Sequence, residues 1–144
     1  MSHPETTLDL LERSREALTN GYAASAASAR YLAASLAALR AGAALVAARS
    51  ATRPGLASGG NGPHDVWVLT ARVAPELTEW AQRFAASTGQ RVGVETGLVR
   101  VTAREADDLL RDAETFVDLA ARRLGVPTVP AGQRPKRLVP VRSA

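Results

Sequence analysis

The only cluster in this sequence whose spacing could serve metal binding or acid–base catalysis is a group of four carboxylates. They are Glu105, Asp107, Asp108 and Asp112. On a helix three of these acids share one side, but a two-metal carboxylate centre also needs matching ligands, histidines among them, from other helices. The sequence offers no such set, so it predicts no metal site. A solvated helix face is favoured, with i, i+4 pairs between Arg104 and Asp108 and between Asp107 and Arg111.

His64 precedes Asp65, and a carboxylate beside an imidazole can orient it for proton transfer. Adjacent residues at the start of a helix do not face each other, however, so a surface histidine is favoured. The chain has no cysteine, which excludes thiolate metal sites, disulfides and cysteine nucleophiles. The glycine-rich stretch 58–62 lacks the Lys-Ser/Thr pair of a phosphate-binding loop. The sequence therefore predicts neither a catalytic residue nor a cofactor.

The arginines are distributed unevenly along the chain. The net charge is +4, and residues 17–64 contain arginines but no acid. Because Arg40 flanks an apolar stripe, we expect it to pair with Glu105 or Asp112 of another helix. Arg30 faces outward, and two interpretations are equally supported: an ion pair with another helix, or contact with an anionic partner. The candidate nucleic-acid-binding residues are Arg30, Arg49, Arg53, Arg134, Lys136, Arg137 and Arg142.

Composition predicts an all-α fold for the elements that carry these residues. Apolar residues make up 46% of the chain and aromatic residues only 4%, with alanine, the best helix former, abundant. Periodicity places four antiparallel helices at about 4–19, 22–49, 64–97 and 102–124. Residues 1–124 would form one bundle with a loop at 50–63, and the Pro-rich basic tail 125–144 would be disordered.

The second predicted helix is apolar on two sides, which is typical of a helix buried on both. We expect its alanine side to contact another helix or a second copy of the chain. One side carries leucine and valine, at Leu32, Leu36, Leu39, Ala43 and Val46. The other is mostly alanine, at Ala23, Ala27, Ala34, Ala41, Leu45 and Ala48. The charges Arg30 and Arg40 interrupt this run and the N-terminus is acidic, so we expect a cytoplasmic protein with no membrane span.

The later helices carry clear boundary signals. Asp65 is the expected N-cap of the third helix, and Pro75 should kink or break it. Residues 91–101 are interpreted as the fading end of that helix, with a short hairpin as the alternative. A capping box of Thr102 and Glu105 should start the last helix, and Gly125 should end it. Trp80 is expected in the core and Trp67 on its rim, where a partly exposed ring could also meet a base or a protein.

Two stretches, VWVLTARVAPELTEWAQ (66–82) and TAREADDLLRDAETFVDLA (102–120), resemble a small, mostly actinobacterial branch of the HEPN (higher eukaryotes and prokaryotes nucleotide-binding) domains. The likeness covers most of residues 8–124. It implies four or five helices around a long antiparallel hairpin, often in a symmetric dimer. Many HEPN proteins are metal-independent ribonucleases whose signature is an Arg, four to six intervening residues and then a His. Here residues 57–59 before His64 are Ala-Ser-Gly, and His3 has no upstream Arg, so no catalytic residue carries over.

The sequence therefore favours a non-catalytic HEPN-like protein that dimerises and binds a macromolecule, with nucleic acid as one candidate partner. Two other classes stay open. A divergent ribonuclease or toxin-type RNase would use arginine together with the carboxylates of the last helix, converging in a pocket. A protein-interaction adaptor would instead show an apolar groove in neutral surroundings.

Overall fold

The chain folds as an antiparallel bundle of helices with no strand in the residues that the structure describes. The structure is a computed structural model that describes residues 4–52 and 62–127. Its elements are α1 (Pro4–Ala23), α2 (Ala27–Thr52), α3 (Pro63–Val73), a 3-10 turn η1 (Pro75–Leu77), α4 (Thr78–Glu95) and α5 (Ala103–Arg123). The all-α prediction is confirmed. The predicted tail, apart from its first three residues, and most of the predicted loop lie outside the described residues, and that part of the domain prediction stays a prediction.

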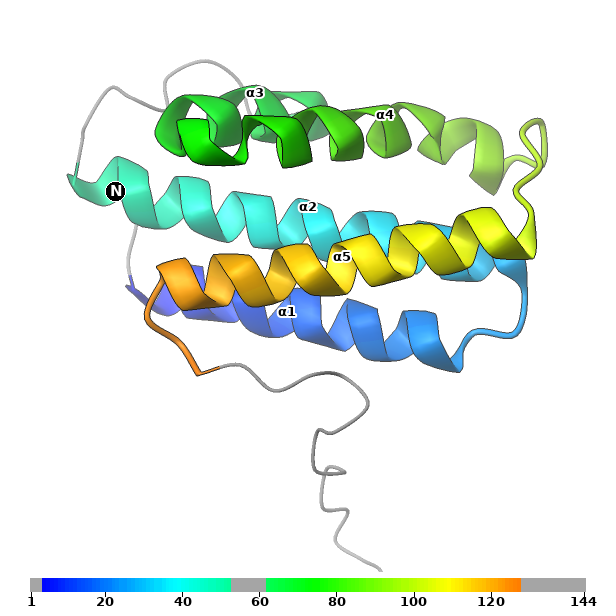
Figure 1. The fold of residues 1–144 in the computed structure, drawn as a ribbon, viewed down its shortest axis with the longest axis horizontal. Helices are drawn as coiled ribbons and strands as arrows, with labels where there is room; N and C mark the ends of the chain where they lie inside the picture. The colour runs from blue at the N-terminus through cyan, green and yellow to red at the C-terminus, as the bar shows by residue number, and fades with distance from the viewer. Residues whose placement is uncertain (1–3, 53–61, 128–144) are drawn as a thin grey trace, which may run out of the picture.

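α2 is the central helix, and it contacts each of the other four. In Figure 1, α1 lies below α2, α3 and α4 lie above it, and α5 crosses in front. The alanine side of α2 faces these neighbours, with Ala34, Ala38, Ala41 and Leu45 fully buried. Small side chains allow the helices to approach closely, as at Gly42, where an added Cβ would lie 3.0 Å from the ring of Trp67. The expectation that this side packs on another helix is confirmed within one chain.

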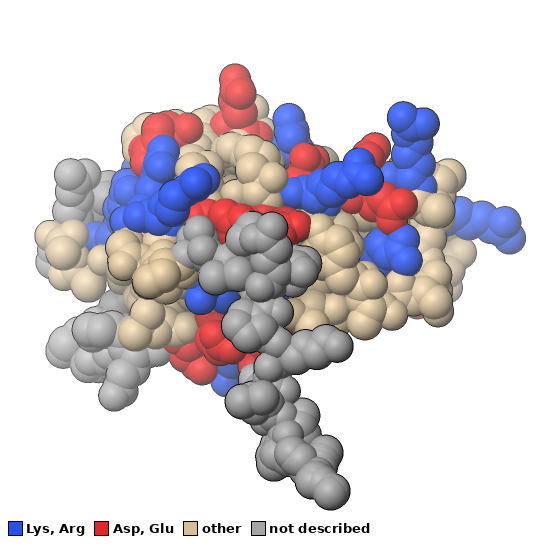
Figure 2. All heavy atoms as spheres, turned by 60° about the horizontal axis from the view of Figure 1, so that its bottom comes forward, with Lys and Arg blue, Asp and Glu red and all other residues tan. Residues whose placement is uncertain are grey.

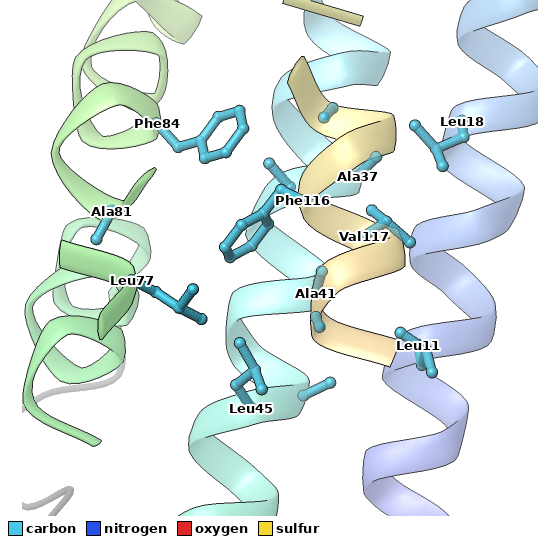
Figure 3. Packing of buried hydrophobic residues seen from close by; sticks show 14 of the residues in the cluster. Leu11, Leu18, Ala37, Ala41, Leu45, Leu77, Ala81, Phe84, Phe116 and Val117 are labelled. Atoms are coloured by element: carbon cyan, nitrogen blue, oxygen red, sulfur yellow. The ribbon is translucent and has the colours of Figure 1, made fainter. Parts of the chain in front are cut away.

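The core joins α1, α2 and α5 on one side to α3, η1 and α4 on the other (Figure 3). Leu11 and Leu18 of α1 point toward Val117 of α5, and Leu77 and Phe84 point toward Phe116. The rings of Phe84 and Phe116 have centroids 5.1 Å apart. Both tryptophan rings also contact this pair, at centroid distances of 5.4–6.0 Å. Aromatic packing therefore holds α3 and α4 against α5, although the chain has few aromatic residues.

Several predicted boundaries shift by one to five residues for local physical reasons. α1 continues through the predicted stop at Asn20-Gly21 to Ala23, so Tyr22 and Ala23 belong to α1 and not to the second helix. Gly21 serves a close approach between helices, because a Cβ there would lie 2.8 Å from Leu110 Cδ1. Asp65 is not the N-cap of α3. It is the third residue of the helix and accepts a hydrogen bond from the N–H of the N-cap Gly62 at 3.1 Å.

The predicted break at Pro75 and the predicted boundaries of the last helix are confirmed. α3 ends at Val73, η1 follows, and α4 begins at Thr78, which makes two helices of the predicted third one. α4 ends at Glu95, and Gly97 turns the chain with φ +81°, as the fading-helix interpretation requires. Thr102 and Glu105 form the capping box through bonds of 2.8 and 3.0 Å. Gly125, with φ +74°, follows the C-cap of α5.

The two tryptophans exchange their predicted roles. Trp67 is only 2% exposed, and its indole N–H donates to Thr88 Oγ1 at 2.8 Å, whereas Trp80 is half-buried. Arg83 lies over the Trp80 ring, 5.1 Å from its centroid. The prediction followed one apolar stripe across Pro75, although it expected a kink or break there, and a single helical period does not place both rings once α3 ends at Val73 and α4 begins at Thr78. Trp67 is therefore not available to stack on a base or a partner.

Candidate macromolecule-binding surfaces

Arg30 makes its polar contacts within the bundle. Its guanidinium forms an ion pair with Asp107 of α5 and donates a hydrogen bond to the carbonyl of Ala24 at 2.6 Å. Of the two interpretations of this arginine, the internal one is confirmed. Asp107 pairs with Arg30, so the predicted pairing of Asp107 with Arg111 is wrong. Arg30 is therefore no longer a candidate nucleic-acid-binding residue.

The predicted pairing of Arg40 with an acid of α5 is also wrong. Its Nη1 donates to the backbone carbonyl of Arg13 in α1, at 3.5 Å. Glu105 is engaged in the capping box, and Asp112 lies 3.3 Å from Arg83 of α4. The two partners face different neighbours. Arg40 is on the side of α2 that contacts α1, whereas Glu105 and Asp112 of α5 line the groove toward α4.

One end of the bundle, which we term the basic end, brings arginines of α2 and α5 together around one glutamate. Arg49 of α2 donates to the carbonyl of Val73 at 3.0 Å and lies 3.5 Å from Glu76 Oε2. Arg123 of α5 reaches the same oxygen at 3.0 Å. A backbone hydrogen bond at Glu76, assisted by Arg123 and Arg49, lowers the pKa of this carboxyl. Glu76 therefore stays charged and ties the ends of α2 and α5 to η1.

The helix turns that form the basic end contain more arginines than acids. Within the described residues, the last turns of α2, α3 and α5 and the first turns of η1 and α4 contribute four arginines and two glutamates: Arg49, Arg72, Arg122, Arg123, Glu76 and Glu79. Arg122 is exposed and has no ion-pair partner among residues 4–52 and 62–127. In Figure 2 one group of basic side chains lies at the left-hand end of the molecule, and others lie over its right-hand half among acidic side chains. The sequence did not single out Arg122 and Arg123. They could have been found from their position in the last turn of α5, directly before the basic C-terminal segment.

Five of the predicted nucleic-acid-binding residues lie outside the described residues: Arg53, Arg134, Lys136, Arg137 and Arg142. Both chain segments that carry them start at the basic end. Residue 53 follows α2, and the segment from Arg134 to Arg142 follows α5. Arg49, the remaining candidate, is partly committed to Glu76 and Val73. The side chain of His64 is likewise outside the described set.

A second surface, the α4–α5 groove, lies near the opposite end and encloses about 430 Å³. It brings Arg83, Arg100 and Tyr31 together with Glu105, Asp108 and Asp112. Burial, and then the negative charge of Glu105, raise the pKa of Tyr31, so its hydroxyl stays protonated. Within the described residues, no group of three or more His, Cys, Asp or Glu side chains could hold a metal ion. The predicted pair Arg104–Asp108 does not form, since neither side chain has an ion-pair partner in the structure's described part.

The third surface is the leucine stripe of α2, defined as Leu32, Leu36, Leu39, Ala43 and Val46. Each of these side chains is half-buried, in contrast to Ala34, Ala41 and Leu45 of the alanine side, which are fully buried. α2 has the length and hydropathy of a candidate membrane span, with a mean hydropathy of 1.6 over an 18-residue window. Half of that window is buried against the rest of the bundle, and a single helix of this kind is weak evidence for a membrane span.

The architecture of this chain is an all-α bundle of HEPN type, with a kinked helical pair packed on a central apolar helix. A family model described as SAV_6107-like HEPN matches residues 21–121, and the chain belongs to this family. The resemblance inferred from residues 66–82 and 102–120 is thereby confirmed. No curated protein and no solved structure matches the chain significantly.

Proposed function

We propose that this protein is a non-catalytic, cytoplasmic HEPN module that binds an anionic macromolecule, nucleic acid in the first place, through its basic end. The observation that carries the proposal is the continuity of positive charge there. Arg122 and Arg123 close α5, and the segment that follows, residues 125–144, has four bases and no acid. Such a surface attracts phosphates without reading sequence, and its affinity falls with salt.

The proposed assembly is a homodimer that uses the leucine stripe of α2. The alanine side of α2 packs on other helices of the same chain, so it is not available to contact a second copy. The leucine stripe retains exposed apolar surface and, apart from Arg40 beside it, carries no charge. Two copies related by a twofold axis would each cover the stripe of the other. Leu36→Glu should give a monomer in sedimentation analysis with an unchanged helical spectrum, and exposed Val68→Glu on α3 is the matched control.

Nucleic-acid binding is tested by fluorescence anisotropy with a labelled single-stranded RNA. We expect a dissociation constant of about 10⁻⁴ to 10⁻⁶ M at physiological salt. The Arg134→Ala, Lys136→Ala, Arg137→Ala and Arg142→Ala variant should lose most of this affinity, and Arg122→Ala should weaken it further. Arg91→Ala with Arg104→Ala, at the opposite end of the bundle, should bind like the parent chain. Equal loss in both sets, or unchanged binding in the first, would reject the basic end as the site.

The non-catalytic part of the proposal rests on proton transfer. The HEPN ribonuclease reaction needs a group that titrates near neutral pH, and arginine stays charged. Sequence positions 57–59, which would hold the motif arginine before His64, are Ala, Ser and Gly. We expect no cleavage of RNA by the purified protein. Cleavage that is abolished by His64→Ala would overturn this statement.

The α4–α5 groove favours one second candidate, a divergent ribonuclease. It places Arg83, 3.3 Å from Asp112, beside Asp108, which has no ion-pair partner in the described part of the chain. An arginine could hold a phosphate there while a carboxylate accepts a proton. RNA cleavage that survives His64→Ala but is lost in Asp108→Asn would establish this candidate, and the exposed Glu95→Gln is its control.

A further inference from the structure

A groove along α1 lies where the described part of the C-terminal segment leaves the bundle. This α1 groove encloses about 450 Å³ and is lined by Leu8, Asp9, Leu11, Glu12, Arg15 and Val126. Leu11 forms a buried floor, and Leu8, 52% exposed, forms an apolar wall. Because Val126 is itself a wall of the groove, the chain enters the groove as it leaves α5.

Two hydrogen bonds hold the start of the segment in this place. The N–H of Val126 donates to the carbonyl of Ala121 at 2.9 Å, and Arg15 Nη2 donates to the carbonyl of Pro127 at 2.7 Å. The second bond joins α1 to the first residues after α5. It directs the chain over α1 and away from α3 and α4, which lie on the far side of α2 (Figure 1).

The rim of the groove is acidic, and the segment that follows is basic. Asp9, Glu12 and Glu16 are spaced i, i+3 and i+7 on α1, so they form one row beside Leu8 and Leu11. Asp9 pairs with Arg13 at 3.3 Å, whereas Glu12 and Glu16 have no ion-pair partner in the described ranges. Residues 128–144 contain three Arg and one Lys, no acid, and the apolar pairs 129–130 and 138–139.

We infer that the α1 groove is the docking site of this chain's own C-terminal segment, residues 128–144. Docking would place Val129 and Pro130 over Leu8 and the bases from Arg134 to Arg137 along the row of Glu12 and Glu16. Seventeen residues can span up to about 55 Å when extended, several times the length of the groove. The tether supplies an effective concentration in the millimolar range, so modest contacts are enough for docking. The inference stands whether or not the chain binds nucleic acid.

Docking on α1 would compete with nucleic-acid binding for the same basic residues. The bases that would neutralise the α1 row are those proposed to meet phosphates at the basic end. Nucleic acid must therefore displace the segment from α1 before it engages all four bases. Removing the acidic row should raise nucleic-acid affinity, and this effect is a secondary readout that only matters if binding is observed.

Docking is tested by paramagnetic relaxation on the full chain, which has no native cysteine to complicate labelling. A nitroxide on Gln133→Cys should broaden the amide signals of α1 residues 8–16 more than those of α4. With Glu12→Lys and Glu16→Lys added, the docking equilibrium constant should fall by about tenfold, because two exposed ion pairs of modest strength are lost. The matched control is Glu79→Lys with Glu95→Lys, an equal change of charge at exposed positions away from the groove, which should leave the broadening unchanged.

Three outcomes overturn the inference. Broadening of α1 that does not change with Glu12→Lys and Glu16→Lys would show tethering without docking. Broadening centred on the α4–α5 groove would assign the segment elsewhere. Broadening transferred to an isotope-labelled chain from a separate spin-labelled chain would show docking between two copies. Thermal unfolding by circular dichroism verifies that each variant folds before it is compared.

Discussion

α2 and α5 are both long helices of the core, yet they bury their surface in different ways. α5 has one apolar side, with Ala106, Ala113, Phe116 and Ala120 fully buried, and an opposite side rich in charge. α2 is half-buried or buried at every position from 30 to 50. A one-sided helix can be oriented from its own sequence, because only one side can face the core. A helix that is apolar all round can be oriented only by its neighbours.

The two helices also differ in the polar contacts that their side chains make. The acids of α5 reach to α1, α2 and α4: Glu114 accepts from Tyr22, Asp107 pairs with Arg30 and Asp112 with Arg83. α2 has three arginines and no acid, so each of its charged side chains must find a partner on another element or on the backbone. The bundle is thus held at the centre by small apolar contacts of α2 and at the periphery by the carboxylates of α5.

The largest loss of stability is expected from a charge introduced on the alanine side of α2. Ala41→Glu should destabilise the protein by about 4 kcal/mol or more, because the new carboxylate would be buried without a partner. Ala43→Glu, two residues away on the leucine stripe, should leave the monomer folded and disturb only association. Urea unfolding of both variants measures the difference. If Ala41→Glu were as stable as Ala43→Glu, the inner side of α2 would not be the core.

A smaller loss is expected from α5. Phe116→Ala should lower the free energy of unfolding by about 3–5 kcal/mol, since it removes a ring that packs on both tryptophans and on Phe84 and leaves a cavity. Thr115→Ala, exposed on the opposite side, should stay within about 0.5 kcal/mol of the parent. Equal stabilities in denaturant unfolding would contradict the one-sided description of α5.

The capping box of α5 gives a still smaller effect. Thr102→Ala removes the side-chain acceptor of the Glu105 N–H and should cost about 1 kcal/mol. Arg104→Ala changes an exposed side chain that has no ion-pair partner within the described residues, and it should be nearly neutral. Thermal unfolding at one pH compares the two variants. A larger loss from Arg104→Ala would mean that charge, and not the cap, stabilises the start of α5.

The smallest effect concerns Tyr22, whose hydroxyl donates to Glu114 and links α1 to α5. Burial, then the hydrogen bond and charge of Glu114, raise the pKa of Tyr22 from 10.0 to about 12. The unfolded chain loses this proton first, so the contribution is complete below pH 10 and disappears as the pH rises toward 12. Because Tyr22 is 49% exposed, the effect is modest. Tyr22→Phe should flatten the fall in stability over this range, and an unchanged pH profile would show that the hydrogen bond contributes nothing.

Local signals in the sequence determined much of this fold. Alanine content and periodicity predict the helical class, and Pro75 predicts the break because it cannot donate the helical hydrogen bond. Thr102, Glu105 and Gly125 predict the limits of α5, since capping and positive φ depend on neighbouring residues alone. The surplus of bases after α5 was also evident in the sequence.

Tertiary structure alone decided which charged and aromatic residues meet. Trp67 is buried and Trp80 is half-buried, because the sequence predicts a break at Pro75 but not the direction that α4 takes after it. Arg40 met the backbone of α1, and Arg30 met Asp107, because the rotation of an all-apolar helix about its axis is set by the packing of its neighbours. Glu76 joined Arg49 to Arg123 only because the ends of α2, η1 and α5 converge. Such pairings depend on distances between segments far apart in the chain, and no spacing within one helix encodes them.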